Sequence, residues 1–335
     1  MWTLAANILP SREEANLKPS ADIRRVVLIR RLSRLIVVAV ILLLTGSVSA
    51  YAGSAAQATF AAPDQAVSAL VAAAEAGSIT DLLRILGPEG KPLVSSGDAV
   101  ADRRALKNFV ALYAEANRIT TQGADHATLV LGKDEWPFPI PLIGAGGAWR
   151  FDTAAGKEEI LDRRIGLNEL SVIDVCLAYV GAQRDYASKD RNLDGFDEYA
   201  QKFASSPGKR DGLYWPTKAD EEESPLGPLV AAAQAAGYKG KGSQGDRIPY
   251  YGYYYRILYG QGNDAPGGAY DYVVDGHMIG GFALVAFPAQ YDVSGITTFI
   301  VNHDGIVYQK DLGPRTAEIA AQMARYNPDA TWTKQ

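Results

Sequence analysis

The spacing of hydrophobic residues changes along the chain, and this change constrains the fold more than any other feature. From residue 63 to residue 113, apolar side chains recur at intervals of three and four, which predicts three amphipathic helices. The pattern is carried by Val67, Leu70, Val71 and Ala74, by Leu82, Leu83 and Ile85, and by Leu106, Phe109, Val110 and Tyr113. At 128–131 and 148–151 it shortens to runs typical of strands beside glycine-rich turns. Helices followed by strands over residues 63–155 predict a small α+β domain.

The second half of the chain begins with a long helical pattern. Residues 156–188 predict one helix, in which Ile173, Leu177 and Val180 share a face. A stretch rich in Gly, Pro and Lys follows at 205–248. Within it, Ser224-Pro225 predicts a helix start, because serine caps helices and proline fits their first turn.

The last third of the chain has the alternation of antiparallel strands. Asp275-Gly276 and Asp304-Gly305 lie between apolar runs, and Asp-Gly is a strong signal for a hairpin turn. A closing helix is predicted at 316–326. Residues 156–335 are therefore predicted to form a second α+β domain, a long helix with an antiparallel meander sheet.

Three prolines alternate with apolar residues in the stretch WPFPIPL, residues 136–142. Proline lacks the N–H group that a central strand must donate, so we expect an extended segment at a sheet edge or in polyproline II form. Its apolar side chains are predicted to pack on the core of the first domain as a lid. The alternative is a groove or an interdomain clasp.

The first 52 residues have the composition of a secretory signal. Residues 1–34 form a basic n-region with five arginines between 24 and 34, residues 35–44 are apolar and uncharged, and small residues follow. This order predicts a Sec-type signal peptide and a periplasmic or extracellular protein, with a flexible leader at 53–62. Arg30-Arg31 also fits a twin-arginine signal. In another alternative the segment stays uncleaved as an inner-membrane anchor, the one contact with a membrane that we expect.

The charge balance bears on possible partners. The net charge is −5, and residues 1–50 hold seven basic and three acidic residues, so the remainder carries 26 basic and 35 acidic residues, a net charge of −9. Binding to nucleic acid requires a basic surface, so we expect no nucleic-acid partner.

Cysteine usage limits how the fold is stabilised. The chain has a single cysteine, Cys176, so it cannot form an intrachain disulfide. Cys176 lies beside the apolar face of the long predicted helix, and we expect it to be a small buried hydrophobic residue.

Several segments together resemble a known family. They are GKDEWPFPIPLI, WRFDTAAGKEEILDRRIGLNEL, KRDGLYWP, GGAYDYVVDGHMIGGFALVAFPAQY and FIVNHDGIVYQKDLG. The chain resembles the bacterial secreted family called domain of unknown function 2950, over most of residues 60–333. The resemblance implies an exported protein of Gram-negative bacteria and no established activity.

Two further likenesses concern fold alone. Residues 63–155 are similar in layout to the cystatin-like, nuclear-transport-factor-like fold, in which a curved sheet wraps a helix. Residues 165–310 are similar in layout to the globular heads of type IV pilins and pseudopilins, with parallels at Gly252-Tyr253, residues 298–301 and Gly305. The pilin export signal is absent, so the second likeness implies a pilin-like head without pilin polymerisation.

The stretch DRNLDG, residues 190–195, suggests a calcium loop. Numbered as such a loop, its candidate ligands are Asp190, Asn192, Asp194, the Phe196 carbonyl and Glu198. Alternating acidic residues on a tight turn supply the six to eight oxygens that calcium binds. Position 12 is Gln201 rather than glutamate, so the EF-hand pattern is incomplete. The alternative is a solvated Asx turn after a helix. A calcium ion here would be structural, and no other cofactor is expected.

Two other groups of residues are candidates for function. Tyr251, Tyr253, Tyr255 and Tyr259 alternate, so one sheet face could offer a platform for sugar or peptide, or simply pack under a helix. His277 and His303 lie beside the predicted hairpin turns. With Asp271 and Asp304 they would supply acid–base groups if the turns shared one end of the sheet.

The sequence as a whole favours a non-catalytic function. It contains no G-x-S-x-G, H-E-x-x-H, Walker or dinucleotide-binding pattern. We therefore expect an exported envelope protein that acts in binding or assembly, with an envelope protein or a saccharide as partner. The alternatives are a periplasmic hydrolase that uses His277, His303 and the nearby aspartates, and a small-molecule pocket in the first domain.

Overall fold

The computed structural model describes residues 56–218, 220–238 and 248–335. The predicted signal peptide, residues 1–52, and the start of the leader lie outside these ranges. The described chain divides into two compact units, one of residues 56–95 with Ala101–Gly166 and the other of Ser96–Val100 with the described residues from Leu167 onward. Both units combine helices with antiparallel sheets, which confirms the predicted α+β class. The predicted boundary after residue 155 lies within α7 (Thr153–Tyr186), whose residues belong to both units.

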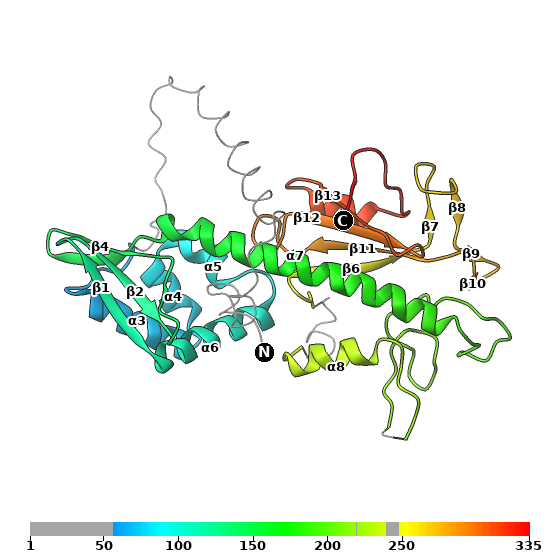
Figure 1. Cartoon of the computed structure of the whole chain (residues 1–335), viewed down its shortest axis with the longest axis horizontal. Helices are drawn as coiled ribbons and strands as arrows, with labels where there is room; N and C mark the ends of the chain where they lie inside the picture. The colour runs from blue at the N-terminus through cyan, green and yellow to red at the C-terminus, as the bar shows by residue number, and fades with distance from the viewer. Residues whose placement is uncertain (1–55, 219, 239–247) are drawn as a thin grey trace. The chain divides into compact units, whose positions relative to one another are not determined.

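The N-terminal unit packs helices on an antiparallel sheet (Figure 1). Its helices are α3 (Pro63–Glu75), α4 (Ile79–Leu86), the 3-10 turn η2 (Pro88–Gly90), α5 (Lys91–Val94), α6 (Ala99–Glu115) from Ala101 onward, and α7 as far as Gly166. Its strands are β1 (Asn117–Gln122), β2 (His126–Leu131), β3 (Trp136–Pro137), β4 (Leu142–Ala145) and β5 (Ala148–Phe151), in the order β1-β2-β4-β5 with β3 paired to β2. The helical and strand patterns of residues 63–155 therefore form elements of the predicted types.

The proline-rich stretch lies at the edge of this sheet, as its missing N–H groups predict. β3 pairs only briefly with β2, through Val130↔Pro137 and Leu131↔Trp136. Phe138 and Ile140 are buried in the core of the unit. The segment therefore packs on the core as a lid.

The C-terminal unit consists of the remainder of α7, a long connection with α8 (Gly227–Ala235), and a five-stranded antiparallel sheet. The strands are β6 (Tyr253–Leu258), β11 (Ala283–Pro288), β12 (Thr297–Asn302), β13 (Val307–Asp311) and β14 (Thr333–Lys334), in the order β14-β13-β12-β11-β6. Two small ribbons pair β7 (Gly260–Gln261) with β8 (Tyr270–Asp271), and β9 (Val273–Val274) with β10 (His277–Met278). Helix α9 (Thr316–Gln322) follows β13 and is shorter than the predicted 316–326.

Both predicted hairpins are present. In the first, Val274 pairs with His277 across Asp275 and Gly276, whose φ angles of 51° and 90° are those of a tight two-residue turn. In the second, Val301 pairs with Val307, and Gly305 has a φ of 80°. The apolar run that follows Asp275-Gly276 forms two strands rather than one, because Gly281 adopts a φ of 140° between β10 and β11.

The predicted helix start at Ser224-Pro225 is wrong by a few residues. Helix α8 begins at Gly227, and the buried Ser224 hydroxyl has no hydrogen-bond partner rather than capping the helix. The Ser224 carbonyl instead accepts a bond from the Gly227 N–H at 2.7 Å, which closes a turn before the helix.

Helix α7 supplies a central part of the C-terminal core. Val172, Cys176 and Tyr179 are buried there against strands β6, β11 and β12. Among the described residues, α7 is the one helix long and apolar enough to cross a membrane by those two criteria alone. Its buried face makes it the core helix of the unit.

Candidate functional site

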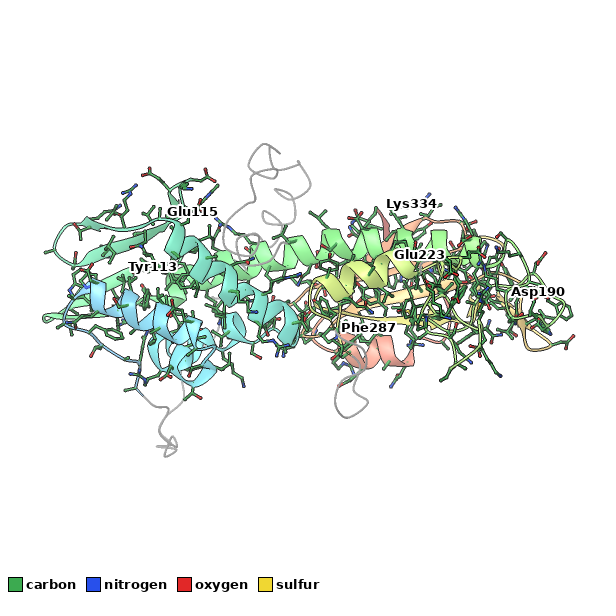
Figure 2. The ribbon with its side chains drawn as sticks, turned by 90° about the horizontal axis from the view of Figure 1, so that it is seen from below. Tyr113, Glu115, Asp190, Glu223, Phe287 and Lys334 are labelled. Carbon is green, nitrogen blue, oxygen red and sulfur yellow. The ribbon has the colours of Figure 1, made fainter. Side chains whose placement is uncertain are left out.

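Asp190, labelled in Figure 2, lies in the loop that follows α7, and its carboxylate organises this loop. This carboxylate accepts hydrogen bonds from the backbone N–H groups of Leu193 at 2.7 Å, Asp194 at 3.2 Å and Gly195 at 2.9 Å. Leu193 and Gly195 have φ angles of 62° and 95°, so the chain turns sharply here. The Phe196 N–H donates to Asp194 Oδ1 at 3.1 Å. Asp190 therefore holds the turn together from inside.

Asn192 links two carboxylates of the same loop. Its Nδ2 donates to Asp194 Oδ2 at 2.6 Å and to Glu198 Oε1 at 2.7 Å. The other oxygen of Glu198 accepts a bond from the Met278 N–H at 3.0 Å, and Glu198 is only 8% exposed. Asn192 Oδ1 is buried without a hydrogen-bond partner. The loop is thus tied to strand β10 through Glu198.

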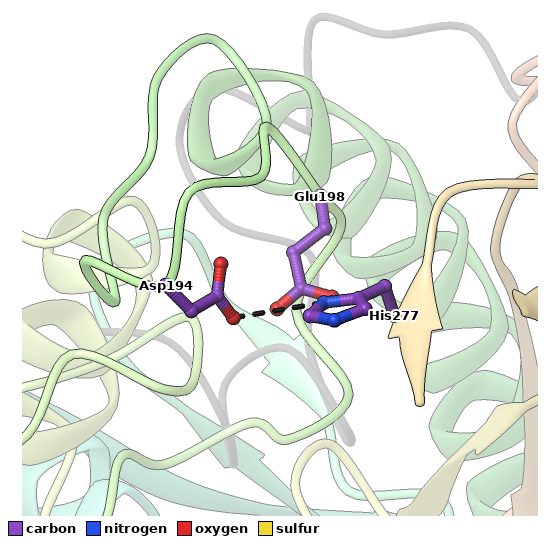
Figure 3. A group of neighbouring side chains, drawn as sticks. All are labelled: Asp194, Glu198 and His277. Atoms are coloured by element: carbon purple, nitrogen blue, oxygen red, sulfur yellow. Dashed lines mark ion pairs between the residues drawn. The ribbon is translucent and has the colours of Figure 1, made fainter. Parts of the chain in front are cut away.

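His277 joins these carboxylates from a distant part of the sequence (Figure 3). It is the first residue of β10, directly after the Asp275-Gly276 turn. Its Nδ1 lies 3.3 Å from Glu198 Oε2 and 3.6 Å from Asp194 Oδ2. The Phe196 ring stacks on the imidazole, with centroids 4.0 Å apart. One residue of the proposed acid–base group therefore lies beside two residues of the proposed calcium loop.

The other three acid–base candidates have different surroundings. His303 Nε2 lies 3.9 Å from Asp304 Oδ1, and the His303 ring meets Tyr272 edge-on. Asp271 accepts a hydrogen bond from Arg325 at 2.6 Å. Within the described ranges, none of His303, Asp304 and Asp271 joins a group of three or more His, Cys, Asp or Glu side chains whose ligand atoms lie within 4.8 Å of one another.

The alternating tyrosines, Tyr251, Tyr253, Tyr255 and Tyr259, do not all lie on strand β6. Tyr251 precedes strand β6 in a turn, with a φ of 51°, and Tyr259 follows the strand and is 47% exposed. Tyr253 is fully buried, and its hydroxyl donates to the Thr297 carbonyl at 2.9 Å. Tyr255 lines a cavity. The period of two therefore places only Tyr253 and Tyr255 on one face of β6.

A cavity of about 470 Å³ lies between α7, α8 and the edge strand β6 of the C-terminal unit. Its aromatic lining residues are Tyr179, Phe203, Tyr238, Tyr250, Tyr254 and Tyr255, and its aliphatic ones are Val175, Leu226, Leu229, Val230, Ala233, Ile248 and Leu284. Helix α8 and the residue before it supply four of the aliphatic residues, Leu226, Leu229, Val230 and Ala233. The described lining contains no Asp, Glu, Lys, Arg or His side chain.

Several tyrosine hydroxyls around the cavity are bonded within the protein. The Tyr238 hydroxyl donates to Asp98 Oδ2 at 2.6 Å, and the Tyr255 hydroxyl donates to the Tyr250 carbonyl at 3.2 Å. Burial raises the pKa of Tyr179 and of Tyr255 well above the ordinary value, so both hydroxyls stay neutral. These rings therefore offer the cavity mainly apolar surface.

The N-terminal unit holds a smaller cavity. Its volume is about 60 Å³, and it lies among apolar residues of α3, α4 and α6 with Arg164 at its margin. Arg164 donates to the carbonyls of Pro92 and Leu93 at 2.6 Å each. Ligand pockets usually measure roughly 300–1,000 Å³, so the cavity in the C-terminal unit is the better match to a small molecule.

Two features of the site were not predicted from the sequence. The first is the pairing of Glu198 with His277, which are far apart in the chain. The second is the role of Phe203 and Tyr238 in the cavity, since both lie in the long irregular connection. An alternating pattern reports which residues share a face of one strand, and it carries no information on such contacts.

Comparison with protein-family models identifies the family of the chain. A family model described as "Protein of unknown function (DUF2950)" matches residues 57–335. No curated protein and no solved structure matches the chain.

Proposed function

The chain belongs to the DUF2950 family of proteins of unknown function, as its sequence motifs predicted, and on that premise we propose a function from its own geometry. In this proposal, the protein is exported to the cell envelope, and its C-terminal unit binds a neutral, mainly apolar small molecule. The observation that carries this proposal is the tyrosine-lined cavity of about 470 Å³, a volume in the range of small-molecule pockets.

The lining favours a neutral ligand with an aromatic or aliphatic body. Burying a charged ligand requires a compensating charge, and the described lining residues supply none. A saccharide needs hydrogen-bond partners for its hydroxyl groups. The hydroxyl groups of Tyr238 and Tyr255 already donate their hydrogen bonds to acceptors within the protein. The absence of Asp, Glu, Lys, Arg and His side chains from the described lining supports a binding role rather than acid–base catalysis in this cavity.

A matched pair of substitutions on α8 tests the ligand site. Ala233 lines the cavity, whereas its neighbour Ala232 is exposed on the outer face of the helix. Ala233→Trp should fill the cavity and weaken binding of the neutral fluorescent probe N-phenyl-1-naphthylamine at least tenfold. Ala232→Trp makes the same chemical change outside the cavity and should leave the affinity unchanged. The proposal fails if the wild type does not bind the probe, or if the two variants bind it equally.

The exported location rests on the basic and apolar segment at residues 1–52. Fractionation of a Gram-negative host that produces the full chain should recover the protein in the periplasm or medium, shortened by about fifty residues. An intact chain in the membrane fraction would support the anchor alternative, and an intact chain in the cytosol would contradict export.

The finer fold likenesses belong to the same proposal. A five-stranded antiparallel sheet with packed helices supports a cystatin-like, nuclear-transport-factor-like N-terminal unit. A long helix packed on an antiparallel meander supports a pilin-head-like C-terminal unit. An experimental structure with a different strand order in either sheet would remove the corresponding likeness.

A further inference from the structure

We propose that Asp194, Glu198 and His277 form a binding site for Zn²⁺ or a similar divalent first-row metal ion, with Zn²⁺ as the best match. The site is independent of the tyrosine-lined cavity and of the ligand proposed for it. It differs from the calcium loop expected from the sequence, because one ligand is an imidazole from another part of the chain (Figure 3).

The distances between the candidate ligand atoms suit a tetrahedral ion. Zn–N and Zn–O bonds of about 2.0–2.2 Å in tetrahedral directions hold ligand atoms roughly 3.4 Å apart. His277 Nδ1 lies 3.3 Å from Glu198 Oε2 and 3.6 Å from Asp194 Oδ2. One imidazole and two carboxylates would leave the fourth position of the ion to a water molecule.

The state of His277 Nδ1 is an independent indication of a ligand. This nitrogen is buried and makes no hydrogen bond, although two carboxylate oxygens lie nearby. Buried polar atoms normally have a hydrogen-bond partner, so a buried nitrogen without one needs an explanation. An imidazole nitrogen that makes no hydrogen bond and faces carboxylates can bind a metal ion. The stacked Phe196 ring holds the imidazole in this orientation.

The side-chain amide of Asn192 already bridges the carboxylates of Asp194 and Glu198 with its positively polarised NH₂ group. Its Nδ2 lies 2.6 Å from Asp194 Oδ2 and 2.7 Å from Glu198 Oε1. A cation between the carboxylates would take over this bridging role with a full charge, at a place where Glu198 is almost completely buried.

The same geometry disfavours calcium. Calcium binds six to eight oxygens, and imidazole is a ligand for zinc, copper, iron and nickel. Both oxygens of Asp190 accept bonds from backbone N–H groups of the turn, and Asp190 does not belong to the group of converging ligand atoms. That group consists of the Asp194 and Glu198 carboxylates and the His277 nitrogen, so it offers calcium few oxygens and includes a nitrogen.

The test uses the full chain, treated with chelator and desalted, with Zn²⁺ or Ca²⁺ alone as the probe. Zinc titrated in a calorimeter should bind with a stoichiometry of one at this site. At a hundredfold excess over Kd, zinc should raise the unfolding midpoint of the C-terminal unit by roughly 5–10 °C. Calcium at the same concentration should leave the midpoint unchanged.

Three variants separate the outcomes. His277→Gln and Asp194→Asn should each lose the zinc-induced shift, and the Asp194 carboxylate is exposed enough for its variant to fold. His126→Gln is the control, because His126 Nδ1 also lies 2.9 Å from a carboxylate oxygen, of Asp125, but in an exposed pair. It should keep the shift. The proposal is overturned if zinc has no effect on the wild type, if His277→Gln keeps the full shift, or if calcium stabilises the chain through Asp194 without His277.

Discussion

Three glycines of helix α7 allow the same substitution to be made in very different surroundings. A Cβ added at Gly156 would lie 2.3 Å from the Pro139 carbonyl oxygen and 2.7 Å from Ile140 Cα. Both are backbone atoms of the proline-rich lid. At Gly166 and Gly181, nothing lies within 4 Å of the added Cβ. Of these three glycines, only Gly156 lies so close to the lid that a side chain at its position would collide with the lid backbone.

The expected effects have opposite signs. Alanine is favoured over glycine in a helix interior by about 0.5–1 kcal/mol, and Gly166→Ala should keep most of this gain. At Gly156 the gain is opposed by overpacking, which costs about 1–3 kcal/mol, and the upper part of that range applies because backbone must move. Gly156→Ala should therefore lower the free energy of unfolding by about 1–2 kcal/mol, which puts the two variants about 2–3 kcal/mol apart.

Urea unfolding at 25 °C, followed by tryptophan fluorescence and far-ultraviolet circular dichroism, measures this difference. With a slope of about 1–3 kcal/mol per molar urea, the midpoints of the two variants should differ by about 0.7–3 M. Gly181→Ala serves as a second control in the C-terminal unit. If Gly156→Ala stabilises the protein as much as Gly166→Ala does, the lid does not pack on the first turn of α7 and the reasoning is refuted.

Two further predictions concern the partly buried Glu169 and the buried Cys176 of α7. Burial raises the pKa of Glu169 above its ordinary value of 4.5, although its carboxylate accepts hydrogen bonds from the N–H groups of Ile296 and Thr297. The contribution of Glu169 to the free energy of unfolding is therefore complete below pH 4.5. It is lost as the pH rises through the pKa of the folded state. Glu169→Gln should flatten the fall in urea midpoint above pH 4.5, and parallel profiles for variant and wild type would contradict this. Burial also raises the pKa of Cys176 to about 12, so its thiol should react with iodoacetamide only as fast as the chain unfolds; rapid stoichiometric labelling of the folded protein would show that the thiol is accessible.

Local turn chemistry was predicted well from the sequence. Asp275-Gly276 closes a two-residue hairpin because both residues can adopt positive φ angles, a property of the residues themselves. The edge position of the proline-rich lid follows in the same way from missing N–H groups. In contrast, β1 (Asn117–Gln122) is a polar strand without apolar alternation, and its pairing with β2 is what makes it a strand.

The candidate sites were predicted only in part, because their contacts are long-range. The alternation of Tyr251 with Tyr253 was interpreted as one continuous strand, but the positive φ of Tyr251 begins a turn instead. The spacing of Asp194 and Glu198 in one loop predicts them as candidate ligands. Their neighbour His277 lies 79 residues beyond Glu198. The hairpin meets the loop through long-range contacts, among them the hydrogen bonds from the Met278 N–H to Glu198 and from the Tyr199 N–H to the Met278 carbonyl.

The short segment Ser96–Val100 has a practical consequence for dissecting the protein. It belongs to the C-terminal unit although it lies within the sequence of the N-terminal one. Its buried Asp98 accepts hydrogen bonds from the Tyr238 hydroxyl at 2.6 Å and from the Gly252 N–H at 3.1 Å. No single cut can therefore yield both halves whole: a fragment that starts at residue 167 would leave these two donors without their acceptor, close to the wall of the cavity.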